Sequence, residues 1–470
     1  MKIIRFTLFL LAFNMGWSQD LPVDSPIVLR FDEYMGYVKK YHPLVSQAEL
    51  RLNEGEAALL SARGGFDPKI EADLDRKKFQ ETEYYNELNA TFKIPTWYGI
   101  EFKANFEENS GDFLNPDMSL PEGGLYSAGV SFSLAQGFWI NERMAMLRKA
   151  RFFREQSKAD RDLMVNAVLA EASKAYFTWL EATNERLIYT RFKENAEIRF
   201  KGVKQGVEAG EQAPIDSVEA KIAVQNRMLS LEAAILKQRK ATLALSNYLW
   251  LNGIPMELQE NVMPEAPGEA TIRTSLLLAE ALNDNWLDAH PKLRSQDYKI
   301  RGMRVERSLK RNMLLPRLDV QYNFLSTEAT PLNSFDSANY KAFVNFSMPL
   351  FLRKERGELK LANIKLQDAN LDMMSSALAI QNKVDAVNAE ISSLDRQNIL
   401  IGSVVGDYEQ LVAAEERKFF LGESSLFLIN SRESGLINTQ LKANKLVIDK
   451  YNSLVKLFEA LGRAPEAQVN

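Results

Sequence analysis

The hydrophobic pattern of this chain alternates between two periods in a fixed order. Over 29–63 apolar residues recur every three or four positions, which predicts an amphipathic helix with a break at His42-Pro43. Between 67 and 137 the period changes to two, as in residues 70–74, where apolar and polar side chains alternate. This region is predicted to hold four strands, each with one apolar face.

Very long helices follow the strands. The helical period returns over 140–208 without a glycine or proline before Gly202, and at 1.5 Å per residue such a helix would extend about 100 Å. A turn at 210–214 is predicted to reverse the chain into a second helix over 215–251. The first half of the chain is therefore predicted to fold as helix, strands and a long helical hairpin.

The second half repeats this order. Both histidines of the chain lie in His-Pro pairs, at His42 and His290, and the prolines Pro68 and Pro316 follow at the same interval. Rare residues in register indicate an internal duplication, and they mark helix restarts rather than histidine chemistry. The repeats are predicted to span 20–271 and 272–470. The second contains a helix over 272–313, strands over 316–350, a long helix over 353–420, a turn at 422–426, a helix over 427–462 and a short tail.

The strands decide between two fold classes. The long helices carry a coiled-coil seam, for example Val384, Val387, Ile391 and Leu394, which alone would favour a bundle or fibrous rod. The strands are too few to close a soluble sandwich, whereas a membrane barrel needs an apolar outside and a polar inside. We predict a mainly α fold with membrane β: a long antiparallel α-helical coiled-coil barrel and a short transmembrane β-barrel formed jointly by several chains.

Composition narrows the function. Residues 1–19 read as a signal peptide, with a short basic region, an apolar core and a small-residue cleavage site. The net charge of -4 gives no basic footprint for nucleic acid, and the chain has no cysteine and only two histidines. No nucleophile elbow or phosphate loop is present. We therefore expect no enzymatic activity, no metal, no cofactor and no nucleic-acid partner.

Aromatic residues cluster where the predicted strands meet the helices, which is where a membrane-interface belt belongs. Taken singly, each of these aromatic residues could equally well be an ordinary packing residue. The predicted interface residues are Trp97, Tyr98, Phe138, Trp139 and Phe351.

Four segments in register make the chain resemble the TolC-like outer-membrane efflux proteins. The starts of the repeats, 31–70 and 276–318, resemble the family's amphipathic helix, Asn/His-Pro break and proline-led strand. The helix-tip segments VEAGEQAPIDSVEAKIAV (207–224) and FFLGESSLFLINSRESGL (419–436) resemble its glycine-containing turns. The resemblance covers nearly the whole mature chain.

The resemblance implies a homotrimer in the bacterial outer membrane, in contact with its lipid and extending into the periplasm. It would be the exit duct of a tripartite efflux or type I secretion system, with a periplasmic adaptor (membrane-fusion) protein and an inner-membrane pump as partners. The tip turns would form the periplasmic aperture and meet the adaptor, and acidic residues there could filter cations or latch the closed state, although solvated helix-end charges explain them equally well. The candidate tip residues are Gly210, Glu211, Pro214, Asp216, Glu415, Glu416, Gly422, Glu423 and Ser424.

One segment departs from the family pattern of two strands per repeat. Residues 87–107 offer two more strands per chain, which would either enlarge the trimer barrel from twelve strands to eighteen or fold as a hairpin against the helices. We expect the family's twelve. The rival function is a periplasmic coiled-coil adaptor or scaffold, which should lack a duplicated strand pair with an apolar face.

Overall fold

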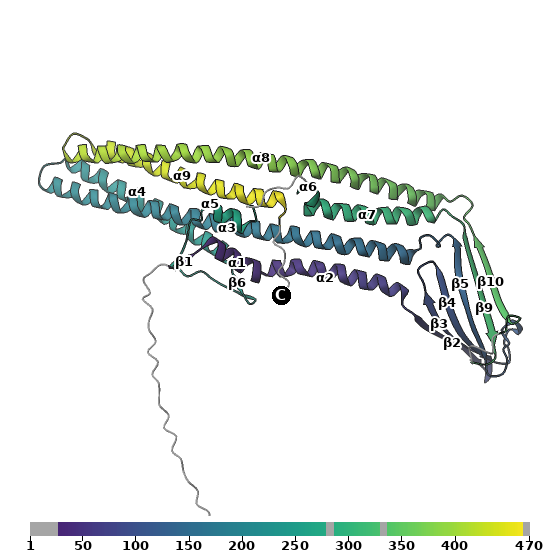
Figure 1. Ribbon diagram of the computed structural model, residues 1–470. Coiled ribbons are helices and arrows are strands. Elements are labelled where there is room, and N and C mark those ends of the chain that lie inside the picture. The colour runs from purple at the N-terminus through teal and green to yellow at the C-terminus, as the bar shows by residue number, and fades with distance from the viewer. Residues whose placement is uncertain (1–26, 279–285, 330–335, 464–470) are drawn as a thin grey trace, which may run out of the picture.

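The chain forms a long rod with a β-sheet at one end and helical turns at the other (Figure 1). The computed structural model describes residues 27–278, 286–329 and 336–463. The predicted signal peptide 1–19 and the end of the predicted tail lie outside these residues. Within the described ranges, no helix combines the length and the apolar run that crossing a lipid bilayer requires.

Six strands form one antiparallel sheet in the order β10-β9-β5-β4-β3-β2. The two repeats join where β5 pairs with β9. The strands are β2 (Lys69–Phe79), β3 (Thr82–Pro95), β4 (Ile100–Ser110), β5 (Leu125–Ala135), β9 (Arg317–Ser326) and β10 (Tyr340–Ser347). The expectation that segment 87–107 adds nothing to the family's two strands per repeat is wrong, and so is the alternative of a hairpin against the helices. The segment pairs with β2 on one side and β5 on the other, because its alternating apolar residues continue the same sheet face.

The register places apolar side chains on one face of all six strands. One row of paired residues runs Ile70, Phe92, Ala104, Ala128, Phe324 and Tyr340. Several of these side chains are exposed, Ile70 at 81% and Phe92 at 40%. The sheet therefore has a continuous apolar face that nothing in the chain covers among the described residues, as the period of two predicted.

The helices form a layer four helices wide. In the half next to the sheet the contacts run α2 (Pro43–Arg63), α3 (Glu142–Glu208), α7 (Pro291–Asn312), α8 (Arg353–Phe420). In the tip half, α4 (Pro214–Ser246) replaces α2 and α9 (Leu426–Leu461) replaces α7, while α3 and α8 run the length of the rod. The two predicted long helices are confirmed.

The main core lies at the middle of the rod. Tyr176 and Trp179 of α3 are buried there against Phe31 of α1 (Phe31–Tyr41). The Tyr176 hydroxyl lies 2.8 Å from both the Leu29 and the Glu265 carbonyl oxygens. It thereby anchors β1 (Ile27–Leu29), which pairs in parallel with β8 (Val262–Pro264).

Two predicted helices differ in extent from the helices of the structure. The helix predicted over 215–251 ends at Ser246, and β6 (Trp250–Leu251) pairs with β7 (Ile254–Pro255) across Asn252-Gly253, whose φ values of 52° and 82° suit a tight hairpin.

The helix predicted over 272–313 is instead α5 (Glu269–Ser275), α6 (Trp286–Ala289) and α7, with 279–285 outside the described residues. Helix α5 ends here because Leu277 adopts a left-handed conformation. The preceding residue, Leu276, is buried in the core.

Each histidine caps the helix that its proline opens. His42 precedes α2 and His290 precedes α7, and in both the ring Nδ1 accepts a backbone N–H, from Leu44 at 3.2 Å and Lys292 at 3.1 Å. His290 Nε2 also lies 3.2 Å from the Ala460 carbonyl oxygen, to which it donates. Nδ1 can accept only when it is unprotonated, so both caps require neutral rings. The predicted restart is confirmed, and capping explains the histidines.

Acid will weaken these caps. Burial lowers the pKa of both His42 and His290 below the usual 6.5. The unfolded chain then binds more protons below about pH 6.5, so the stabilisation is present above that pH and is lost as the pH falls toward the folded-state pKa values. We expect the thermal midpoint to fall between pH 7 and pH 5, and to fall less in His290→Asn, which caps without titrating. An equal fall in His290→Asn would contradict this role.

Candidate functional site

The second face of the sheet is polar. One row of paired residues contains Lys69, Lys93, Lys103, Gly129, Asn323 and Lys341. Neighbouring rows supply acids: Lys93 pairs with Glu71, and Lys341 Nζ lies 3.8 Å from Glu107 Oε1. This face alternates with the apolar one along every strand, which is the arrangement of a wall between lipid and water.

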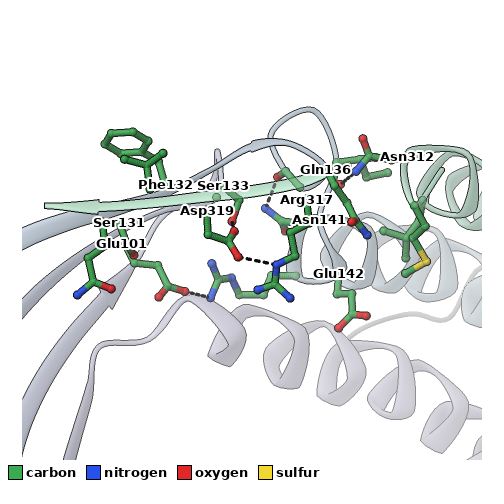
Figure 2. Close-up of a pocket in the computed structure, with 18 of the residues that line it drawn as sticks. Glu101, Ser131, Phe132, Ser133, Gln136, Asn141, Glu142, Asn312, Arg317 and Asp319 are labelled. Atoms are coloured by element: carbon green, nitrogen blue, oxygen red, sulfur yellow. Dashed lines mark hydrogen bonds and ion pairs between the residues drawn. The ribbon is translucent and has the colours of Figure 1, made fainter. Parts of the chain in front are cut away.

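A hollow of about 520 Å³ lies where this polar face meets the helices (Figure 2). Arg143 Nη1 of α3 donates to Glu101 Oε1 of β4 at 2.6 Å, and Ser133 Oγ of β5 donates to Asp319 Oδ1 of β9 at 2.6 Å. Figure 2 shows Phe132 on the opposite side of the sheet from Glu101. The first bond ties β4 to the start of α3, and the second ties β5 to β9.

The predicted interface aromatics lie at this same end of the sheet. Trp97 and Tyr98 are in the β3–β4 turn, Phe138 and Trp139 precede α3, and Phe351 precedes α8. Trp139 is 75% exposed and Phe351 71% exposed, whereas Trp97 stacks on Phe66 with ring centroids 5.5 Å apart. Their position is as predicted. A role at a membrane interface stays a prediction.

The two helix tips are built alike. Gly210 and Gly422 follow α3 and α8 with φ values of 76° and 77°, the left-handed conformation that ends a helix without a side-chain clash. Pro214 is the first residue of α4, and the Asp216 carboxylate accepts the backbone N–H of Ala213 at 3.2 Å. The tips pack together through Val203, Ala220 and Leu426. The duplicated turns therefore lie side by side.

The predicted acidic residues have different surroundings. Glu415 Oε1 accepts from Ser424 Oγ at 2.5 Å, and Glu416 pairs with Arg199 at 3.1 Å. Glu211 and Glu423 are exposed in the turns. Thus two of the acids hold neighbouring elements in place, and two present charge to solvent.

A buried ion cluster near the tips was missed by the sequence analysis. Glu433 of α9 is fully buried and pairs with Arg199 of α3 at 3.1 Å and Arg227 of α4 at 3.5 Å. Glu416 of α8 completes the cluster through Arg199, so all four helices of the tip half contribute. No spacing in the sequence marks these residues, because they come from four separate helices.

Apolar side chains are exposed at the tips. Phe420 is 86% exposed, and Leu421, Phe427 and Ile215 are each 68% exposed. Exposed side chains of this size at the end of a rod form a surface suited to contact with another protein.

The sequence matches the family model for outer membrane efflux proteins over residues 38–249 and 282–463. One relative is the pyoverdine export outer membrane protein OpmQ of Pseudomonas putida, 21% identical over 340 residues that cover 72% of this chain and 70% of OpmQ. The fold is similar to that of the Campylobacter jejuni CmeC outer membrane channel, with a TM-score of 0.66, 14% identity and coverage of 92% of this chain and 85% of CmeC.

It is also similar to the open state of the Neisseria gonorrhoeae MtrE outer membrane channel, with a TM-score of 0.66, 14% identity and coverage of 92% of this chain and 88% of MtrE. The family match takes in both repeats and well over half of the chain. The chain therefore belongs to the outer membrane efflux protein family and is a protein of the bacterial outer membrane.

Proposed function

We propose that three copies of the chain close into a passive exit duct of a tripartite efflux or type I secretion system, gated at the periplasmic helix tips. The observation that carries this proposal is the pair of open edges along the rod. One edge is made of β2, α2 and α4, and the other of β10 and α8. Strands β2 and β10 lie at the two ends of the sheet and are exposed along their whole length. Each pairs on one side only, so both ends of the sheet have unpaired backbone groups.

The helical edges carry apolar stripes at coiled-coil spacing. On α4, Ile222, Leu229, Leu236 and Leu243 recur every seven residues and are 52%, 71%, 54% and 53% exposed. On α8, the heptad-spaced residues Ile364, Leu371 and Leu378 are 53%, 58% and 60% exposed. Such seams are buried against a partner helix in a coiled coil.

Joining one edge to the other edge of a second copy would bury both stripes and pair both edge strands. The two edges differ in sequence, so the contact is heterologous and closes by rotation into a ring. The polar sheet face would then line the lumen and the apolar face would contact lipid. The choice of three copies rests on the resemblance to the family.

The tips provide the surface for the partners. We propose that the exposed Phe420, Leu421 and Phe427 dock a periplasmic adaptor protein, which links the duct to an inner-membrane pump. OpmQ is a pyoverdine export protein by name, and export from the periplasm is the direction we propose here. The adaptor alternative loses its basis, because both repeats contribute strands to a sheet with an apolar face.

The gate is tested by removing its charges. The triple variant Glu415→Gln, Glu416→Gln and Glu423→Gln removes negative charge at one tip and should lower the cation-to-anion permeability ratio in planar bilayers. Glu122→Gln removes a carboxylate from the exposed β4–β5 loop, away from the tips, and should leave the ratio unchanged. An unchanged conductance and ratio in the triple variant would reject these acids as determinants of the aperture.

A further inference from the structure

The first repeat contributes two strands more than the second. Repeat two supplies β9 and β10, whereas repeat one supplies β2, β3, β4 and β5. Hairpin β3–β4 lies between β2 and β5, in the interior of the sheet and away from its edges. We propose that this hairpin is part of the barrel wall, so that the outlet is an eighteen-stranded barrel. This inference rests on the proposed assembly of three copies, each with a six-stranded sheet.

The strand pairing and the side-chain pattern both support a place for the β3–β4 hairpin in the barrel wall. Strand β3 pairs with β4 without interruption from Asn86–Ser110 to Pro95–Glu101, and β4 pairs with β5 from Ile100–Phe132 to Glu107–Leu125. On β3 and β4 the apolar positions Ala90, Phe92, Ile94, Phe102 and Ala104 share the face that carries Val130 and Val320. A hairpin outside the wall would have no reason to continue the lipid-facing pattern.

The hairpin is also fixed at its helix-side turn. The Trp97 ring stacks on Phe66, and the Arg148 guanidinium lies 5.5 Å from the ring centroid. Asn141 Nδ2 at the start of α3 donates to the Trp97 carbonyl oxygen at 3.2 Å. Together with the Arg143–Glu101 ion pair, these contacts hold the hairpin above α2 and α3 in line with the other strands.

The circumference of the helical part agrees with that of an eighteen-stranded barrel. Three copies of a layer four helices wide give a ring of twelve helices. At an interaxial spacing of about 9 Å, the circumference of this ring is about 110 Å. Strands about 4.8 Å apart and tilted by about 40° each occupy about 6 Å of the barrel circumference, so eighteen strands also span about 110 Å. Twelve strands would span only about 75 Å.

The outlet would therefore be as wide as the helical duct. An eighteen-stranded wall does not narrow the path at the membrane, so cargo that passes the helical tips meets no second constriction set by strand number. Its lumen would also carry the charges of the hairpin, among them Lys93, Lys103 and Glu101, which a twelve-stranded wall lacks.

The accessibility of alternate residues to a water-soluble reagent tests whether the β3–β4 hairpin is part of the barrel wall. The chain has no cysteine, so single cysteine variants give clean labelling. In outer-membrane vesicles, a water-soluble charged maleimide should label Thr91→Cys at the lumen, and should label Ala90→Cys and Phe92→Cys far less because they face lipid. A lipid-soluble maleimide should label all three.

Strand β9 provides the control, with Val320→Cys and Tyr322→Cys on the apolar face and Gln321→Cys on the polar face. Equal aqueous labelling at 90, 91 and 92, with alternation kept on β9, would overturn the eighteen-stranded wall and leave the exit duct intact. Loss of alternation on β9 as well would overturn the proposed function itself, because the whole sheet would then lie outside the membrane.

Deletion of residues 82–110 gives a second measurement. It removes β3 and β4 and leaves the outer loops to connect β2 with β5. Polyethylene glycols of graded size, added from the outer side of a planar bilayer, should enter the wild-type outlet up to a radius about 1.5 times the limit of an assembled deletion variant. Equal limits would contradict the wider barrel. Should the deletion fail to assemble, the labelling experiment still decides.

Discussion

Replacing Leu229 and Leu236 of α4 by glutamate is expected to abolish assembly while the single chain stays folded. Both side chains are exposed in the chain by itself, at 71% and 54%, so nothing within the chain depends on them. In the proposed ring they lie in the seam against α8 of the neighbouring copy, where an unpaired charge costs several kcal/mol of burial. Size-exclusion chromatography in detergent should show the mass of one chain instead of three, with an unchanged helical signal by circular dichroism.

The control places glutamates on the same helix outside the seam. Lys221 and Arg239 are exposed on α4, about a quarter-turn from the apolar stripe. Lys221→Glu with Arg239→Glu changes the net charge more than the seam variant does, and should still assemble. If the seam variant assembles as well as this control, the α4 edge is not an interface.

Substituting Glu433 by alanine is expected to produce the largest loss of stability at the tips. The Glu433 side chain is 1% exposed, and those of Arg199 and Arg227 are 10% and 15% exposed, so the substitution leaves two buried guanidinium groups without their shared carboxylate. Removing one partner of a buried ion pair costs about 3–5 kcal/mol. Hydrogen exchange should report this as faster opening of α9 and the tip half of α3, and single-channel recordings should show a larger open probability.

Glu409→Ala is the matched control. Glu409 is exposed on α8 and accepts a hydrogen bond from Gln440 at 3.0 Å. Exposed contacts of this kind change stability by about 0.5 kcal/mol or less, so exchange at the tips should be close to wild type. Equal effects of the two substitutions would show that the Glu433 cluster does not hold the four helices together.

Local features of the fold could be predicted from the sequence, and pairing between distant segments could not. The alternation at 88–94 and 100–106 indicates strands, and the structure has β3 and β4 there. Whether these strands join the sheet depends on their partners β2 and β5, and a period of two says nothing about partners. The expectation of two strands per repeat came from the resemblance, and this chain departs from it.

The site shows the same division. Gly210 and Gly422 could be placed in turns because a helix that ends in a left-handed residue favours glycine. The Arg199–Glu433 pair could not be found, since contact between α3 and α9 depends on the rotation of each helix about its own axis. Likewise Leu277 ends α5 with a positive φ that no pattern of apolar residues indicates.

The proposed ring of three copies is tested most directly by cryo-electron microscopy of the protein extracted from the outer membrane. We expect a threefold ring in which β2 of each copy pairs with β10 of the next, around an open lumen lined by the polar face of the sheet. A particle in which β2 and β10 stay unpaired, or in which the apolar face lines the lumen, would contradict it.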